Sequence, residues 1–248
     1  SGQSNLIYVL VGLSCIGGFL FGYDTGIISG ALVLIADQYE LTSVEQELVV
    51  TVTIIGAMIA SFGSGPLCDK YGRRPIVILS AVIFIIGAVI MAASPSYPVL
   101  VVGRFIVGLG VGSASMNMPV IISEMAECEV RGFLVTCINV AITFGQLVSC
   151  IVAGSFSYMS EGWRYMFGLA AIPATIQFVG FLYMPESPRW LVQNNQIDAA
   201  ATVLRRLRGI NDIDAELLEI KTSVETERAT AAESEVQSGS TSEPNNCG

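Results

Sequence analysis

Six stretches of this chain are apolar enough and long enough to cross a lipid bilayer, and no other feature constrains its fold as strongly. Each is close to the roughly 20 residues that a membrane-spanning helix needs. The predicted spans lie near residues 6–33, 46–67, 75–94, 98–122, 132–156 and 164–184. The composition agrees, because 52% of the 248 residues are hydrophobic and only 13% are charged. We therefore predict an all-α membrane protein with a six-helix transmembrane bundle over residues 1–185.

The loop charges predict how the bundle is oriented. Basic residues gather in the loops after the second and fourth spans and in the segment after the sixth, whereas Arg164 is alone on the opposite side. By the positive-inside rule, both ends of the chain are cytoplasmic, and an even number of spans satisfies this. We expect the protein to reside in the plasma membrane.

The polar segment after the last span has a different character. Residues 186–227 place apolar side chains at helical spacing with charges between them, which is typical of short amphipathic helices. We predict a cytoplasmic helical linker there. Residues 228–248 are rich in Ser, Glu and Gly, and we predict a disordered tail.

Composition also excludes several kinds of chemistry. The chain has no histidine, which removes the commonest general base and metal ligand. Its six cysteines show no C-x-x-C spacing, so neither a disulfide framework nor a metal site is expected. The acidic residues lie mostly in loops and in the C-terminal quarter, and the net charge of −9 gives no support for nucleic-acid binding. We predict no enzyme activity and no cofactor.

Two opposite charges lie at the same predicted depth within the spans. Asp24 comes before the end of the first span, and Arg104 comes after the start of the fourth. At 1.5 Å per residue, both lie roughly 10–13 Å below the same membrane boundary, so we predict that they pair. The pair either only neutralises two charges and fixes the helix register, or allows Asp24 to take up and release a proton as Arg104 moves away and returns. With no histidine present, Asp24 is the predicted proton carrier.

Three short motifs combine an acid with an arginine near predicted cytoplasmic helix ends. The stretch "GPLCDKYGRRP" is read as a loop in which Gly65 and Gly72 permit tight turns and Asp69 holds an arginine and caps a neighbouring helix. In "EMAECEVRG" and "PESPRWL" the candidate partners are an acid and an arginine of the same motif. We predict a charge network that holds one conformation and releases another, with a simple topology signal as the alternative. Its residues are Asp69, Arg73, Arg74, Glu124, Arg131, Glu186 and Arg189.

These motifs, taken in order, resemble a known family. The stretches "GGFLFGYDTGIISGAL", "DKYGRRP", "GRFIVGLGVG", "PVIISEMAECEVRG", "GWR" and "PESPRWL" are similar to those of the sugar porter family of the major facilitator superfamily. Within that family, the stretch from "GWRYMFG" to "PESPRWLVQ" looks most like the proton–myo-inositol cotransporters. The resemblance implies the N-terminal six-helix half of the family's twelve-helix fold, built as a 3+3 inverted repeat.

The resemblance also implies roles for single residues. Asp24 matches the family's proton-coupling aspartate and Arg104 its partner, while the three acid–arginine motifs match the gating motifs. Gln146 matches the second of two sugar-binding glutamines, and Asn139 stands where the first is expected. Two amides seven residues apart share a helix face and can bind polyol hydroxyls, although amides also join helices.

Three functions follow as hypotheses. The first is proton-coupled symport of myo-inositol or a related polyol or sugar across the bilayer, with the proton as the coupling ion. This requires the C-terminal six-helix half, which supplies most of the family's sugar contacts and is missing from the 248 residues. The second is a facilitative hexose uniporter in which Asp24 is structural. The third is a truncated, non-transporting half that binds a partner.

Overall fold

The computed structural model describes residues 5–126, 128–209 and 213–240, all of it helices and their connections, with no strand in these ranges. The chain divides into two compact units. One is a bundle over Asn5–Glu186, and the other consists of the described residues between Ser187 and Ser240.

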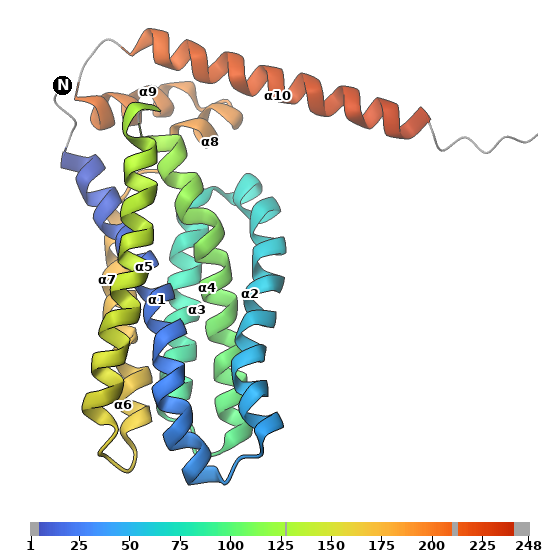
Figure 1. Cartoon of the computed structure of the whole chain (residues 1–248). Coiled ribbons are helices and arrows are strands. Elements are labelled where there is room, and N and C mark those ends of the chain that lie inside the picture. The colour runs from blue at the N-terminus through green and yellow to red at the C-terminus, as the bar shows by residue number, and fades with distance from the viewer. Residues whose placement is uncertain (1–4, 127, 210–212, 241–248) are drawn as a thin grey trace, which may run out of the picture. The chain divides into compact units, whose positions relative to one another are not determined.

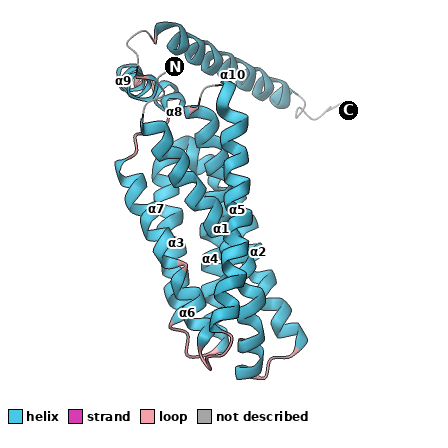
Figure 2. Ribbon diagram, turned by 60° about the vertical axis from the view of Figure 1, so that its left-hand side comes forward, coloured by secondary structure: helices cyan, strands magenta, loops and turns pink. Residues whose placement is uncertain are grey.

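The bundle consists of long helices that run up and down beside one another (Figures 1 and 2). Its helices are α1 (Asn5–Tyr39), α2 (Ser43–Tyr71), α3 (Arg73–Ala92), α4 (Tyr97–Met125), α5 (Cys128–Phe156), α6 (Gly162–Leu169) and α7 (Ala171–Tyr183). Counting α6 and α7 as one segment, the described residues contain six helices long and apolar enough to cross a membrane. The predicted fold class is confirmed.

Helix ends differ from the predicted spans in two informative places. The sixth span is broken at Ala170, because Pro173 in the first turn of α7 lacks an N–H and its ring crowds the carbonyl four residues earlier. The predicted loop "GPLCDKYGRRP" is almost wholly helical, and only Gly72 separates α2 from α3. Gly65 therefore forms no turn and lies inside α2, which corrects the sequence-based interpretation.

Glycines let α1 and α5 pack backbone against backbone. Four glycines recur every four residues along one face of α1, and each lies directly against α5. A Cβ atom at Gly22 would overlap the carbonyl oxygen of Ile142, and one at Gly145 would overlap the carbonyl oxygen of Phe19. Lipid offers no hydrophobic drive for helices to associate, so such close packing supplies the attraction. The four glycines are Gly18, Gly22, Gly26 and Gly30.

The same arrangement joins α4 to α2. Cβ atoms at Gly108 and Gly112 would overlap the backbones of Thr53 and Ala57. In an inverted repeat of three plus three helices, the contact of α1 with α5 corresponds to the contact of α4 with α2. These two pairs share the most extensive helix contacts in the bundle, as the predicted repeat requires.

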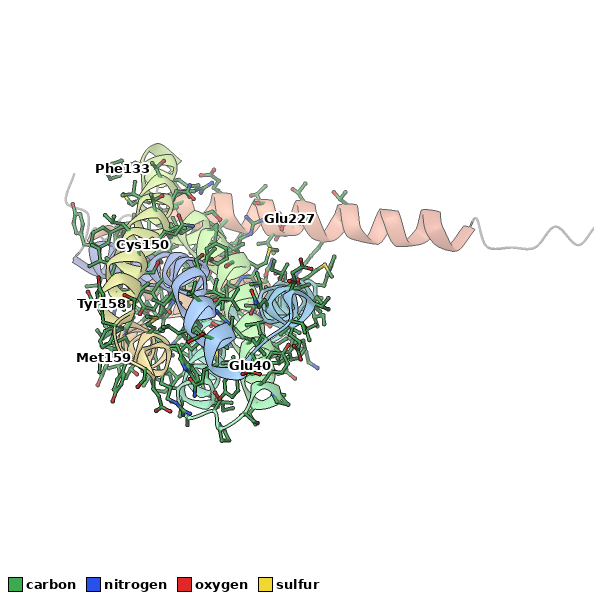
Figure 3. All side chains as sticks on the ribbon, turned by 60° about the horizontal axis from the view of Figure 1, so that its bottom comes forward. Glu40, Phe133, Cys150, Tyr158, Met159 and Glu227 are labelled. Atoms are coloured by element: carbon green, nitrogen blue, oxygen red, sulfur yellow. The ribbon has the colours of Figure 1, made fainter. Side chains whose placement is uncertain are left out.

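Large side chains fill the space between the helix pairs. Trp163, Met166 and Phe167 of α6 are almost fully buried and pack with residues of α1, α3 and α4. The outer surface is apolar as well. On the side of α5, Phe133 is 70% exposed and Tyr158, in the turn that follows, is 94% exposed (Figure 3). An apolar exterior around a packed interior is what a bundle surrounded by lipid requires.

The smaller unit contains three helices, α8 (Pro188–Gln193), α9 (Ile197–Arg208) and α10 (Asp214–Ser240). Leu191, Leu204, Leu207 and Leu217 form its buried interior. The structure differs from the predicted disordered tail, because α10 continues as helix through residues 228–240. Ala and Glu in this stretch favour helix even though few apolar residues are present to pack. Residues 241–248 of the predicted tail lie outside the described residues.

The close contact at Gly22 gives a first prediction. Gly22→Ala should force α1 away from Ile142 and lower the stability of the bundle by about 1–3 kcal/mol, the usual cost of overpacking. Thermal unfolding of the purified protein in detergent measures this loss. Gly12→Ala, on the same helix with no atom within 4 Å of the new methyl group, is the matched control and should be neutral or stabilising. Equal melting temperatures for the two variants would contradict the packing argument.

Candidate functional site

Asp24 and Arg104 form an ion pair inside the bundle, as their matched depth predicts. Nη1 of Arg104 on α4 donates a 2.8 Å hydrogen bond to Oδ1 of Asp24 on α1. Both residues are buried, with 1% of Arg104 and 7% of Asp24 exposed. Removing either partner would leave an uncompensated charge in a low-dielectric interior, so the two residues act as a unit.

Arg104 has a second partner that the sequence does not reveal. Its guanidinium carbon lies 4.8 Å from the ring centroid of Phe167 on α6, within range of a cation–π interaction. Its Nε and Nη2 atoms are buried without a hydrogen-bond partner among the described residues. Phe167 is therefore a second group, besides Asp24, that stabilises the Arg104 cation.

Tyr23 fixes the helix that carries Asp24. Its hydroxyl donates a 2.8 Å hydrogen bond to the backbone carbonyl oxygen of Met166, next to Phe167. The bond ties α1 to α6 one residue away from Asp24. The carboxylate, the guanidinium and the aromatic ring are thus held by three different helices.

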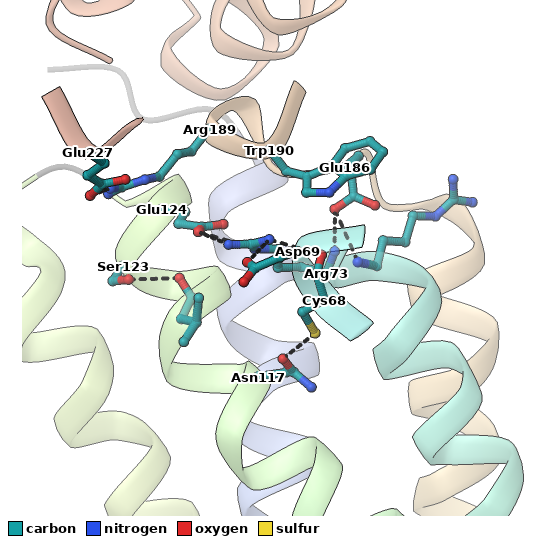
Figure 4. Close-up of polar contacts among 12 residues, drawn as sticks. Cys68, Asp69, Arg73, Asn117, Ser123, Glu124, Glu186, Arg189, Trp190 and Glu227 are labelled. Carbon is teal, nitrogen blue, oxygen red and sulfur yellow. Dashed lines mark hydrogen bonds and ion pairs between the residues drawn. The ribbon is translucent and has the colours of Figure 1, made fainter. Parts of the chain in front are cut away.

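A second set of charges lies where α2 meets α3 (Figure 4). Gly72 has φ = 101°, a conformation that side chains rarely adopt, so this one residue can turn the chain between two helices. Directly after it, Arg73 bonds Asp69 at 3.1 Å and Glu124 of α4 at 3.1 Å. Its Nη1 also donates to the carbonyl oxygen of Cys68 at 3.0 Å, at the end of α2. Arg73 therefore joins the ends of α2 and α4.

Glu186 caps the start of α3. Its Oε1 accepts hydrogen bonds from the backbone N–H groups of Arg73 and Arg74, at 3.0 and 3.1 Å. Pro75 has no N–H, so these are two of the three free donors in the first turn. An anion at a helix N-terminus is stabilised by the backbone dipoles. The acceptor of these two hydrogen bonds is thus Glu186 and not Asp69, the residue that the sequence suggested.

Arg74, in the first turn of α3, binds the C-terminal end of α7. Its Nε and Nη2 donate to the carbonyl oxygens of Phe181 and Leu182, at 3.1 and 2.5 Å, in the last turn of that helix. A cation at a helix C-terminus is also favourable. Glu186 directly follows α7 in the chain. At this end of the bundle, the carboxylate beside α7 therefore binds the N-terminus of α3, and an arginine of α3 binds the C-terminus of α7.

Two of the predicted acid–arginine partnerships were wrong. Glu124 pairs with Arg73 rather than with Arg131, whose Nε is buried without a partner in the described part of the chain. Glu186 binds the backbone of α3, while Arg189 pairs with Glu227 inside the smaller unit. In these two motifs the acid and the arginine bind different partners, so closeness in sequence does not identify the pairs.

The two predicted substrate amides occupy different places on α5. Asn139 lines a cavity of about 240 Å³ between α1, α4 and α5, together with Phe21, Ser115 and Met118. Gln146 lies two turns away on an exposed part of the helix and does not line this cavity. Their roles in binding stay predictions.

Metal binding has no site in the described part of the chain. No group of three or more Cys, Asp and Glu there is placed to hold an ion. The described cysteine side chains Cys15, Cys68, Cys137 and Cys150 are free. Cys68 donates to Oδ1 of Asn117 at 2.6 Å, a contact between α2 and α4 that spacing alone could not predict.

Comparison with known proteins is consistent with this geometry. The model of the family described as "Sugar (and other) transporter" matches residues 10–242. The chain belongs to the sugar transporter family. The match covers nearly all of the chain and includes every residue of the site described above. The predicted resemblance to sugar porters of the major facilitator superfamily is confirmed, and the chain is a multi-pass membrane protein of this family.

Two named transporters are similar to this chain over most of its length. The proton myo-inositol cotransporter of Homo sapiens is 46% identical over 222 residues, which is 89% of this chain and 34% of that protein. The glucose transporter GlcP of Staphylococcus epidermidis is 45% identical and is covered over 48% of its length. The chain thus spans between a third and a half of these two relatives.

Solved structures agree with the fold. The proton:xylose symporter XylE, bound to 6-bromo-6-deoxy-D-glucose, superposes with a TM-score of 0.84 at 32% identity. The alignment covers 93% of this chain and 55% of that one. The inward open conformation of XylE from E. coli gives a TM-score of 0.78. The predicted placement of the chain as the first half of this fold is confirmed.

The cap on α3 gives a second prediction. Glu186→Ala should speed hydrogen exchange at the backbone amides of Arg73 and Arg74 about fivefold, since a lost N-terminal cap costs about 1 kcal/mol. Exchange mass spectrometry of the purified protein measures this. Asp69→Ala is the control, because it removes the other nearby acid but no acceptor for these amides. Faster exchange in the Asp69 variant alone would reverse the assignment of the cap.

The contact between Arg104 and the ring of Phe167 gives a third prediction. Phe167→Leu should cost more stability when Asp24 is already Asn, because the ring then faces an otherwise uncompensated cation. A double-mutant cycle in chemical unfolding should show a coupling of about 0.5–2 kcal/mol, the range of a desolvated cation–π contact. Phe181→Leu is the matched control, because Phe181 is 1% exposed like Phe167 but no contact with Arg104 is seen. Additive effects of Phe167→Leu and Asp24→Asn would contradict the contact's role.

Proposed function

We propose that this chain forms the proton-coupling half of a symporter that moves myo-inositol, or a related polyol or sugar, together with a proton. The observation that carries the proposal is the buried pair of Asp24 and Arg104, bonded at 2.8 Å across α1 and α4. A titratable carboxylate in the interior of a membrane-spanning bundle marks an ion or proton path by default. The similarity to a proton myo-inositol cotransporter supports the choice of ion and substrate.

The pair provides a two-state element. With Asp24 ionised, its charge holds Arg104 and thereby ties α1 to α4. A proton on Asp24 removes that charge and leaves the cation facing Phe167, 4.8 Å away, which weakens the link between the two helices. Proton uptake on one side of the membrane and release on the other would then accompany movement of α1 against α4.

The charges at the α2–α3 junction form the proposed gate. Arg73 bridges Asp69 and Glu124, and Glu186 and Arg74 join α3 to α7. These contacts all lie at one end of the bundle, where breaking a few of them would allow the helix ends to separate. From the distribution of basic residues, we place this end in the cytoplasm.

The substrate site is proposed to be shared with residues outside this chain. The 240 Å³ cavity lined by Asn139 is smaller than the roughly 300–1,000 Å³ of complete small-molecule pockets. The chain also covers only 55% of the XylE chain that it resembles. A second six-helix half would supply the other wall, with Asn139 and Gln146 as contacts from this half.

A facilitative hexose uniporter is the second candidate. It is favoured by the 45% identity to a glucose transporter, and in it the ion pair would serve only to fix two helices. The two functions differ in whether a pH gradient drives accumulation.

The deciding experiment uses labelled myo-inositol and proteoliposomes that contain this chain together with the second six-helix half. With acid outside, wild-type protein should accumulate the label above its external concentration. Asp24→Asn should abolish this accumulation but retain exchange of labelled for unlabelled substrate at equal pH. Asp37→Asn, an exposed acid on the same helix, should behave as wild type.

Each outcome assigns the function. Uptake by wild type that ignores the pH gradient would make the protein a uniporter. Undiminished accumulation by Asp24→Asn would show that this carboxylate does not carry the proton.

A further inference from the structure

Gln177 of α7 is a buried amide that neither the proposed proton path nor the gate uses. Only 2% of the residue is exposed, and its Nε2 atom has no hydrogen-bond partner among the described residues. An amide nitrogen carries two N–H donors, and buried polar groups are almost always satisfied by protein or by a bound oxygen. The cost of leaving such a donor unmet is larger in a membrane interior, where bulk water cannot substitute.

Gln177 faces a small cavity enclosed by α1, α3, α4 and α7. The cavity measures about 20 Å³, which exceeds the roughly 10–15 Å³ that one water-sized oxygen requires. Of the residues that line it, three have polar side chains, namely Ser80, Ser115 and Gln177. A bound oxygen needs two to four polar partners, so the cavity is equipped for one.

The two serines complement the amide as acceptors. The hydroxyl of Ser80 donates to the carbonyl oxygen of Val77 and that of Ser115 to the carbonyl oxygen of Val111, both at 2.8 Å. Their protons are therefore already engaged, while their oxygen lone pairs stay available. A hydroxyl oxygen in the cavity could accept from Nε2 of Gln177 and donate its own proton to a serine.

The small cavity adjoins the larger one that Asn139 lines. Gly17, Phe21, Ala114 and Ser115 contribute to the walls of both. Gly17 keeps the space beside Gln177 clear, since a Cβ atom there would lie 2.9 Å from Nε2. A molecule in the 240 Å³ cavity would therefore touch residues that also enclose the cavity of the buried amide.

We propose that Gln177, Ser80 and Ser115 form a binding site for a single hydroxyl oxygen. This oxygen belongs either to a polyol or sugar in the adjoining cavity or to an ordered water. Only the first source rests on the proposed transport function. In both cases Gln177 is the donor, and the serines are the acceptors.

The first arm of the test is thermal unfolding of the purified protein in detergent without polyol. Gln177→Met keeps the approximate size and removes the amide. If a water occupies the site, this variant should melt about 2–4 °C lower, since a hydrogen bond of about 1 kcal/mol is lost. If the amide has no partner, removing it should leave the melting temperature unchanged or raise it.

The second arm measures the affinity for myo-inositol by equilibrium binding, with this chain and the second six-helix half present together. If a substrate hydroxyl occupies the site, Gln177→Met should weaken binding about three- to tenfold, the loss of one neutral hydrogen bond. If Gln177→Met lowers the melting temperature, Ser115→Ala should lower it too. If Gln177→Met weakens binding, Ser115→Ala should weaken it too. Ser155→Ala is the matched control, because Ser155 makes the same 2.8 Å bond to the carbonyl four residues earlier, on an exposed part of α5 outside the cavity.

The outcomes are decisive in combination. A lower melting temperature assigns the site to water, and weaker binding assigns it to substrate. A Gln177→Met protein with neither change would overturn the proposal. If wild type binds no polyol, the substrate assignment fails separately, and the melting temperature alone decides the site. Should Gln177→Met not fold, Ser80→Ala and Ser115→Ala carry both measurements.

Discussion

Direct contact between helix backbones is the interaction on which the rest of this structure depends. A bilayer gives apolar side chains no reason to leave their surroundings, so helix association rests on close fit and on polar contacts. Glycines at Gly18, Gly22, Gly26 and Gly30 remove the side chains that would separate α1 from α5. Gly108 and Gly112 do the same for α4 and α2.

This packing decides where the charges meet. Asp24 lies between two glycines of α1, on a different face of the helix, and Arg104 lies in the turn before Gly108. Each charge therefore belongs to a helix whose position is already fixed by a neighbour. A 2.8 Å bond between α1 and α4 then needs little adjustment, which limits the cost of burying two charges. The ring of Phe167 completes the enclosure from α6.

Sequence alone was sufficient for the number of spans, the fold class and the Asp24–Arg104 pair, because all three follow from hydropathy and depth. It was not sufficient for the charge partners at the bundle end. Glu124 and Glu186 each have an arginine nearby in sequence, yet both bind elements from a different part of the chain. Partner choice depends on the rotation of each helix about its axis and on where helices end, and hydropathy reports neither.

The other differences between the sequence-based predictions and the structure also have physical causes. A motif rich in Gly and charges was taken for a loop, but α2 continues as helix through Gly65 to Tyr71. The contact of Phe167 was hidden because an apolar residue in an apolar span carries no signal of its own. Gln177 did carry a signal, since it is an amide within an apolar span, and its burial between four helices gives that signal a meaning.

The one-residue connection at Gly72 has a mechanical consequence. Most connections between helices contain several residues that absorb small displacements. Here α2 ends at Tyr71 and α3 begins at Arg73, and both flanking residues are helical. Because a single residue joins the two helices, α2 can tilt in only two ways. Either the φ and ψ angles of Gly72 change, or α3 moves together with α2.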